Sequence, residues 1–266
     1  MYDKNFILTQ LENMGAPTDR PVIVHTSLRA IGEVVGGAQG LLDAFIEYFT
    51  DNGGLLCVPT HTWSNFGSKQ EFILDMLSDK TCIGVFSSVA AGDKRGVRTE
   101  NPTHSLAVFG EKKAVTKFVE CDKRVLTPTS PNGCYGKIYD MDGYVLLVGV
   151  GQDKNTYLHC VEEMLNLPNR ISDETVEMKV RFKDGSVKDR KFCYMRSDVI
   201  YDVSYYFPKL EPAFRAHGCI VDGFIGNAPT QLCSARKMKE VMELIKNNSG
   251  GIELMADDTP LDKKWY

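Results

Sequence analysis

His159 and Glu162 are the two residues of this sequence best suited to proton transfer. They lie in segment 156–165, whose apolar spacing predicts a helix, so the two side chains share a face. A carboxylate beside an imidazole stabilises the imidazolium, and such a histidine can accept a proton near neutral pH. Glu163 ranks below Glu162, because on a helix it points about 100° away. A purely structural histidine is the alternative interpretation, and for a lone histidine on a helix it is the commoner one.

Glycines after the first predicted strand suggest an anion site. Free backbone N–H groups and the helix dipole favour anions where a helix begins, and glycines let a phosphate approach the backbone. The residues concerned are His25, Thr26, Ser27 and Leu28 after the strand, and Val35, Gly36, Gly37 and Ala38 where the next helix begins. Their spacing matches neither a P-loop nor a dinucleotide-binding fingerprint. A tight turn without a ligand is the alternative.

A third polar group lies on the predicted loop 98–105. Arg98 suits a phosphate or a carboxylate, and His104 and Ser105 add hydrogen-bonding groups. A solvated loop with a capping hydroxyl would explain the same residues equally well. His61 follows another predicted strand and could line the same cleft, because ligands of open α/β sheets bind beyond strand ends.

The elements that must position these residues indicate an α/β fold. Buried strands are predicted at 21–25, 55–59 and 144–150, and an amphipathic helix over 38–49 joins the first two into a βαβ-like unit. The strand at 144–150 is apolar nearly throughout, which is typical of a central strand.

The second half of the chain alternates differently. Two segments, 175–182 and 187–194, alternate apolar and polar residues around a turn at Asp184-Gly185, which predicts an antiparallel hairpin. Helices are predicted over 207–216 and 234–246. The tail after Gly251 is predicted to be loosely ordered.

Bulk properties exclude several classes of protein. The 266 residues are expected to form a single domain, 1–266, with a sizeable core, because 43% are hydrophobic. A net charge of −4 argues against a nucleic-acid partner. The eight cysteines include no C-x-x-C pair, so no metal site is predicted. We expect a cytoplasmic protein without a membrane partner, since the sequence shows neither a signal-peptide core nor a membrane-spanning stretch.

Ordered sequence blocks resemble the aminoglycoside 3-N-acetyltransferase family from about Val22 to about Val241. The blocks are His25-Thr26-Ser27-Leu28 with Val35-Gly36-Gly37-Ala38; Pro59-Thr60 with Thr62-Trp63; Arg98-Thr99 with Pro102, His104 and Ser105; Gly149-Val150-Gly151 with Asn155-Thr156, His159 and Glu162; and a closing Gly226-Asn227-Ala228. Each block is modest, and their order and spacing together make the resemblance specific.

The resemblance implies a three-layer α/β/α sandwich around a mixed β-sheet, into which the hairpin near residues 175–194 would be inserted. It also implies acyl transfer from acetyl-CoA to a small amine. Residues 25–28 and 35–38 would hold the pantetheine arm and pyrophosphate of the coenzyme. Arg98, His104 and Ser105 would also contact the coenzyme, toward its phosphate end, and Thr156 would lie near the thioester. His159 would be the general base, oriented by Glu162.

One departure from the family pattern concerns the acceptor. Antibiotic-modifying members are rich in carboxylates before the closing block, whereas here Asp202 remains and Tyr205 and Tyr206 stand where acids are common. We assign Asp202, Tyr206 and Trp63 to the acceptor. Arg170 continues a Pro-x-Arg-like feature of the family.

The leading hypothesis is acetylation of the 3-amino group of a 2-deoxystreptamine aminoglycoside. A different amine acceptor or acyl group is the alternative within the family, and a coenzyme-binding protein without catalysis is the alternative outside enzymes. A homodimer is a further hypothesis, which the sequence itself does not test, because exposed apolar patches are not visible in a sequence.

Overall fold

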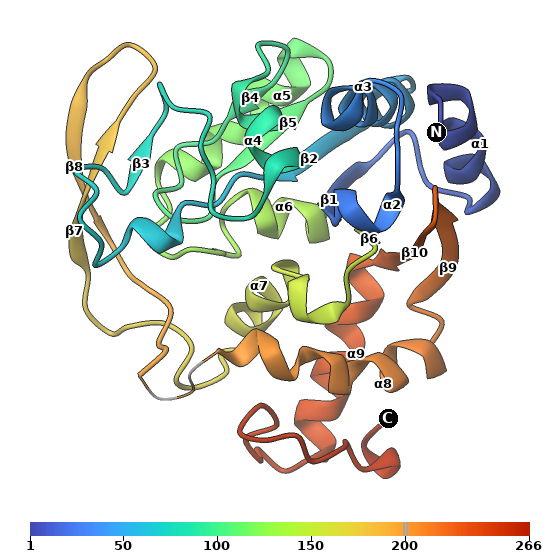
Figure 1. Cartoon of the computed structure of the whole chain (residues 1–266). Coiled ribbons are helices and arrows are strands. Elements are labelled where there is room, and N and C mark those ends of the chain that lie inside the picture. The colour runs from blue at the N-terminus through green and yellow to red at the C-terminus, as the bar shows by residue number, and fades with distance from the viewer. Residues whose placement is uncertain (199, 201) are drawn as a thin grey trace.

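The main sheet of this computed structural model is mixed and carries helices on both faces (Figure 1). The structure describes residues 1–198, 200 and 202–266. Its strands are β1 (Pro21–Thr26), β2 (Leu55–Pro59), β4 (Val97–Arg98), β5 (Leu106–Phe109), β6 (Tyr144–Val148), β9 (Ile220–Ile225) and β10 (Ala228–Ser234). Within the described residues, the sheet has seven strands in the order β4-β5-β2-β1-β6-β10-β9. β1 pairs in parallel with both β2 and β6, and the remaining pairs are antiparallel.

Side chains of the central strands alternate between two cores. Val22 and Leu146 face one core, whereas Ile23 and Val145 face the other, as the period of two in a strand requires. One face is covered by α1 (Lys4–Asn13), α3 (Gly37–Thr50) and α4 (Val85–Gly92), and the opposite face by α5 (Lys112–Val119), α6 (Cys134–Asp140), α7 (Tyr157–Met164), α8 (Glu211–Ala216) and α9 (Ala235–Asn248). The predicted three-layer α/β/α fold is confirmed, as is the βαβ opening over β1, α3 and β2.

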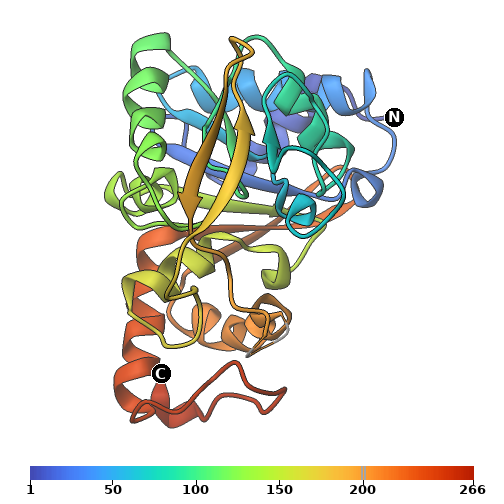
Figure 2. The same ribbon diagram turned by 90° about the vertical axis from the view of Figure 1, so that its left-hand side faces the viewer.

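The predicted hairpin is also confirmed. β7 (Val176–Arg181) and β8 (Val187–Phe192) are antiparallel, and β3 (Leu74–Asp75) adds to β7 in parallel. This small sheet has a core of its own around Val180 and Phe192. Figure 2 looks onto the hairpin, which stands beside the main sheet.

Some sequence predictions of elements were wrong. The segment predicted as one helix over 207–216 is a 3₁₀ helix at Val203–Leu210 followed by α8, because Pro212 lacks the N–H that the interior of a continuous α-helix needs there but that the first turn of α8 does not. Two side chains of the tail after Gly251 are buried, Met255 at 1% and Leu261 at 8% exposure, whereas most of its other residues are exposed. The strand pair β9 and β10 and the helix α6 were not predicted at all. Among the described helices, none combines the length and apolar character that crossing a membrane requires.

Candidate active site

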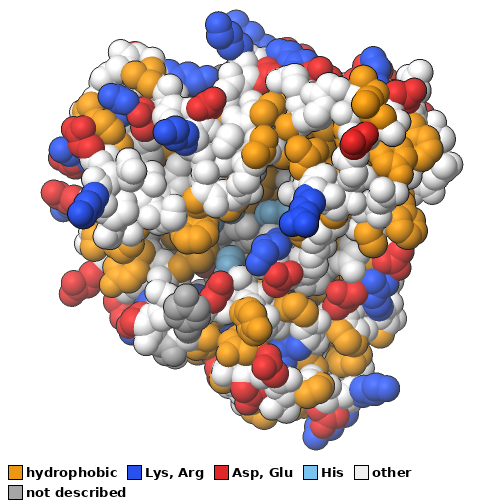
Figure 3. Space-filling model, in the orientation of Figure 1, with side chains coloured by type: hydrophobic (Ala, Val, Ile, Leu, Met, Phe, Trp, Pro, Cys, Tyr) orange, Lys and Arg blue, Asp and Glu red, His pale blue; other side chains and the backbone are white. Residues whose placement is uncertain are grey.

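A cavity of about 820 Å³ lies beyond the carboxyl ends of β1, β2 and β6. His25 and Thr26 reach it from the end of β1, His61 from the residues after β2, and His159 from α7. Open α/β sheets bind ligands at this edge of the sheet. Figure 3 shows the hollow from outside, with histidine side chains visible inside it and Lys or Arg side chains at its edge.

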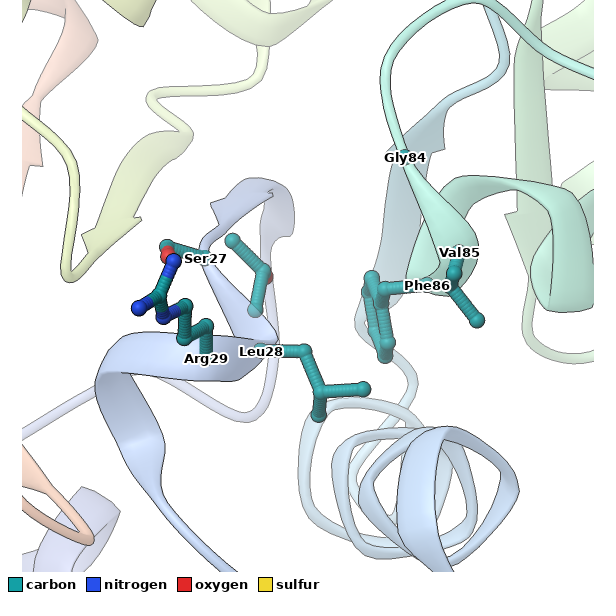
Figure 4. A pocket seen from close by; sticks show the side chains of 7 residues that line it. Ser27, Leu28, Arg29, Gly84, Val85 and Phe86 are labelled. Carbon is teal, nitrogen blue, oxygen red and sulfur yellow. The ribbon is translucent and has the colours of Figure 1, made fainter.

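A second hollow of about 480 Å³ shares Thr26 and Ser27 with the cavity. It lies between α2 (Leu28–Ile31) and the start of α4. Leu28 and Phe86 face each other across it in Figure 4, and the side chain of Arg29 extends toward Ser27. The shared residues make the end of β1 a wall of both spaces.

The predicted base and carboxylate are in contact on α7. His159 Nδ1 lies 3.1 Å from Oε2 of Glu162, and Glu162 is fully buried. A proton on Nδ1 that is donated to this carboxylate leaves Nε2 of the ring as the acceptor. The His159 side chain is 16% exposed and lines the cavity, so its ring is open to a ligand there.

A guanidinium and a second carboxylate extend this pair. Arg170 Nε donates to Glu162 Oε1 at 2.6 Å, and Arg170 Nη2 donates to Glu253 Oε1 at 2.7 Å. Burial works against the charge of Arg170, but the two carboxylates outweigh it, and the pKa of Arg170 is raised. The sequence marked Arg170 only as a family feature, and nothing in the sequence pattern pointed to Glu253.

Three further histidines at the cavity are neutral. Burial lowers the pKa of His25 to about 3. Burial, followed by the nearby charge of His159, lowers the pKa of His104 to about 3 as well. Burial, followed by the influence of His104, lowers the pKa of His61 well below its usual range. His61 Nε2 lies 2.9 Å from the Tyr135 hydroxyl, a contact that the sequence did not indicate. Of the four histidines that line the cavity, His159 is the one whose ring contacts a carboxylate within the described residues.

His25 and Thr26 carry polar atoms without partners. His25 Nε2 and Thr26 Oγ1 are buried and make no hydrogen bond to any described residue. Both residues line the cavity. A buried polar atom without a partner is costly, so each of these atoms suits a polar ligand group.

Arg98 and Ser105 were predicted to contact the coenzyme, but both side chains are buried and bond to other residues of the chain. Arg98 Nε donates to Ser105 Oγ at 3.2 Å, and Arg98 Nη2 donates to the carbonyl of Thr60 at 2.9 Å. Arg98 is 3% exposed, Ser105 is fully buried, and neither residue lines the cavity. Burial lowers the pKa of Arg98 to about 10. These two side chains hold the chain just before His61, rather than lying open to a phosphate.

Of the other predicted site residues, some line the cavity or the adjoining hollow and some lie outside both. Trp63, His104, Thr156 and Asp202 line the cavity, and Leu28 lines the adjoining hollow. Thr156 precedes α7, and its side chain makes no capping hydrogen bond to the helix. The residues that lie outside both linings are Val35, Gly36, Gly37, Ala38 and Tyr206.

The sequence model described as aminoglycoside 3-N-acetyltransferase matches residues 23–245. The chain belongs to this family. Aminoglycoside N(3)-acetyltransferase IV of Salmonella is 30% identical over 163 residues, which are 61% of this chain and 59% of that protein. The SPbeta prophage-derived aminoglycoside N(3')-acetyltransferase-like protein YokD of Bacillus subtilis is 25% identical over 277 residues, with 94% of this chain and 95% of that protein covered.

Solved structures of aminoglycoside acetyltransferases share the fold. A mutant of AAC(3)-IVa in complex with apramycin superposes with a TM-score of 0.73 at 22% identity, covering 94% of each chain. The binary complex of AAC-IIIb with CoASH gives a TM-score of 0.74 at 18% identity, covering 91% of this chain and 94% of that chain. The family membership confirms the predicted enzyme class, an acyltransferase, and its predicted co-substrate, acetyl-CoA.

Proposed function

We propose that this family member transfers the acetyl group of acetyl-CoA to the 3-amino group of a 2-deoxystreptamine aminoglycoside, with His159 as general base. The observation that carries the proposal is the His159–Glu162 contact of 3.1 Å on the wall of a cavity at the strand ends. The names of the relatives support the acceptor, since they include aminoglycoside acetyltransferases.

The chemistry needs one proton acceptor and one oxyanion donor. Nε2 of His159 takes the proton of the amine, whose lone pair attacks the thioester carbonyl carbon. The Thr156 hydroxyl, or a backbone N–H beside it, stabilises the oxyanion that forms. The C–S bond then breaks, and the imidazolium returns the proton to the departing thiolate. Glu162 stabilises the imidazolium between these steps.

The end of β1 suits the arm of the coenzyme. A pantetheine arm carries amide groups, which can pair with the orphaned His25 Nε2 and Thr26 Oγ1. Because the pKa of His25 is lowered to about 3, this ring stays neutral and offers a hydrogen bond without adding charge. The adjoining hollow at Ser27 and Leu28 would take the remainder of the arm.

The charges of the cavity favour the second candidate, a different amine acceptor. Acidic side chains in the lining are Asp153, Glu162 and Asp202. Asp153 pairs with Lys154 at 2.9 Å, and Glu162 pairs with Arg170 at 2.6 Å. Among the described lining residues, Asp202 is therefore the carboxylate left for a substrate ammonium. A polycationic acceptor would be bound more tightly by several free carboxylates, so an acceptor with fewer amino groups fits this lining better.

Replacement of the base is the direct test. His159→Ala should lower turnover by about 10²- to 10⁴-fold, because general-base catalysis contributes about that much. Coenzyme binding, measured by calorimetry, should stay unchanged, since the orphaned atoms belong to β1. Thiol release would report turnover, and a variant as active as the wild type would refute the assigned base.

A panel of amines separates the two acceptors. Thiol release from acetyl-CoA should be measured with several aminoglycosides and with simpler mono- and diamines. Efficient release with deoxystreptamine aminoglycosides supports the leading proposal, and release with simpler amines alone supports the second candidate. Coenzyme binding without thiol release for any amine would favour a binding protein without catalysis.

A further inference from the structure

Arg170 lies between two carboxylates that come from distant parts of the chain. Its Nε donates to Glu162 Oε1 at 2.6 Å, while Nη1 and Nη2 donate to the two carboxylate oxygens of Glu253 at 3.0 and 2.7 Å. The Arg170 side chain is 6% exposed, so these charge-assisted bonds are largely shielded from water. One carboxylate belongs to the helix of the base, and the other belongs to the C-terminal segment.

Glu253 is held in place by the packing of that segment. Met255, two residues further on, is 1% exposed in the core that α7 also contributes to. Lys209 Nζ donates to the carbonyls of Leu254 at 2.6 Å and Asp257 at 2.9 Å. The segment therefore presents the Glu253 carboxylate to Arg170 at a fixed position.

We propose that Glu253 is a positioning residue for the general base, acting through Arg170 and Glu162. The inference rests on the proposed role of His159. Glu162 is fully buried and needs the charge of Arg170 beside it. Glu253 fixes the guanidinium bidentately, and Arg170 Nε then stays on Glu162. Without the Glu253 carboxylate, Arg170 moves away from Glu162. The Glu162 carboxylate then lacks its counter-charge and stabilises the imidazolium of His159 more strongly.

Kinetics of Glu253→Ala give the first readout. We expect kcat to fall about tenfold while the KM values for acceptor and coenzyme stay nearly unchanged, since displacement of a supporting group harms the reacting geometry more than binding. Glu253→Gln keeps the length and one acceptor oxygen, so its kcat should lie between those of Glu253→Ala and the wild type. Asp258→Asn is the matched control, because Asp258 is an exposed acid of the same segment.

Titration of the His159 ring by NMR gives the second readout and needs no turnover. Loss of the Glu253 charge alone would make the imidazolium less stable, so the ring would titrate at lower pH than in the wild type. Displacement of Arg170 has the opposite effect, because Glu162 then acts on the imidazolium without its counter-charge. We expect the upward shift in Glu253→Ala, a smaller one in Glu253→Gln, and none in Asp258→Asn.

The outcomes distinguish this inference from the proposed function. A downward or absent shift with unchanged kcat would overturn the positioning role. If the wild-type protein acetylates no amine, the proposed function fails, yet an upward shift of the His159 titration still supports the coupling of Glu253 to the ring. Equal losses in Glu253→Ala and Asp258→Asn would mean a general effect of the segment, and would also overturn the specific role.

Discussion

At the scale of single residues, the site depends on which histidine has a carboxylate. His25 and His104 have pKa values lowered to about 3 by burial, so neither takes up a proton at neutral pH. His159 instead lies 3.1 Å from Glu162, whose charge Arg170 balances. In the proposed mechanism, histidine therefore serves two purposes: His25 is a neutral hydrogen-bonding group at the end of β1, and His159 is the base on α7.

Glu162→Gln tests the carboxylate without changing its size. Turnover should fall by about 10- to 100-fold, because the imidazolium loses the charge that stabilises it during proton transfer. The acid limb of the kcat/KM profile should move to lower pH, since a less stable imidazolium loses its proton more readily.

The pH profile of Glu162→Gln should be measured beside that of Glu163→Gln. Glu163 follows in the chain but accepts hydrogen bonds from the hydroxyls of Thr127 and Thr129, both at 2.6 Å, rather than from His159. Its neutral variant should leave the acid limb in place. An identical limb in both variants and the wild type would contradict the role of Glu162.

At the scale of elements, the close packing of strand ends decides where the site can form. Gly149 follows β6 and turns the chain with a φ of +64°. A Cβ at this position would lie 2.4 Å from the Cβ of Ala30 and 3.2 Å from that of Ala228. The absence of a side chain therefore lets α2 and β10 meet the end of β6 beside the cavity.

Gly149→Ala should destabilise the fold by about 3 kcal/mol, because it combines a strained φ with a steric overlap. Gly185→Ala in the β7–β8 turn is the matched control, since its φ is +82° but nothing lies within 4 Å of the added Cβ. The control should cost only about 1 kcal/mol. Urea unfolding of both variants checks the difference, and equal losses would contradict the crowding at Gly149.

At the scale of the whole molecule, burying neutral histidines beneath the cavity links stability to pH. His25 and His104 resist protonation in the fold, whereas in the unfolded chain each takes up a proton near its ordinary pKa of about 6.5. The unfolded state therefore binds more protons between about pH 3 and pH 6.5, and the free energy of unfolding decreases as the pH falls through this window.

The loss on going from about pH 7.5 to about pH 5 should be on the order of 2 kcal/mol for each of these two histidines. Urea midpoints at the two pH values measure it. Burial also lowers the pKa of His61, so three rings contribute, and His104→Gln should reduce the total pH dependence by about a third. Midpoints that do not change between the two pH values would show that the rings are not buried as neutral groups.

The sequence determined the local features of this protein. Alternation and apolar runs gave β1, β2, β6 and the hairpin, because strand periodicity follows from the backbone alone. The three-residue spacing of His159 and Glu162 predicted their contact, because both lie on one short helix.

Only the tertiary structure decided the rest. The bond from Arg170 to Glu253 joins residues 83 positions apart, and that from His61 to Tyr135 joins residues 74 positions apart. Such pairs depend on the order of the strands and on the packing of the helices, which no local pattern records. The same reason explains why the prediction for Arg98 differs from its observed contacts. Its predicted loop position suggested a phosphate ligand, but the folded chain buries Arg98 and pairs it with Thr60.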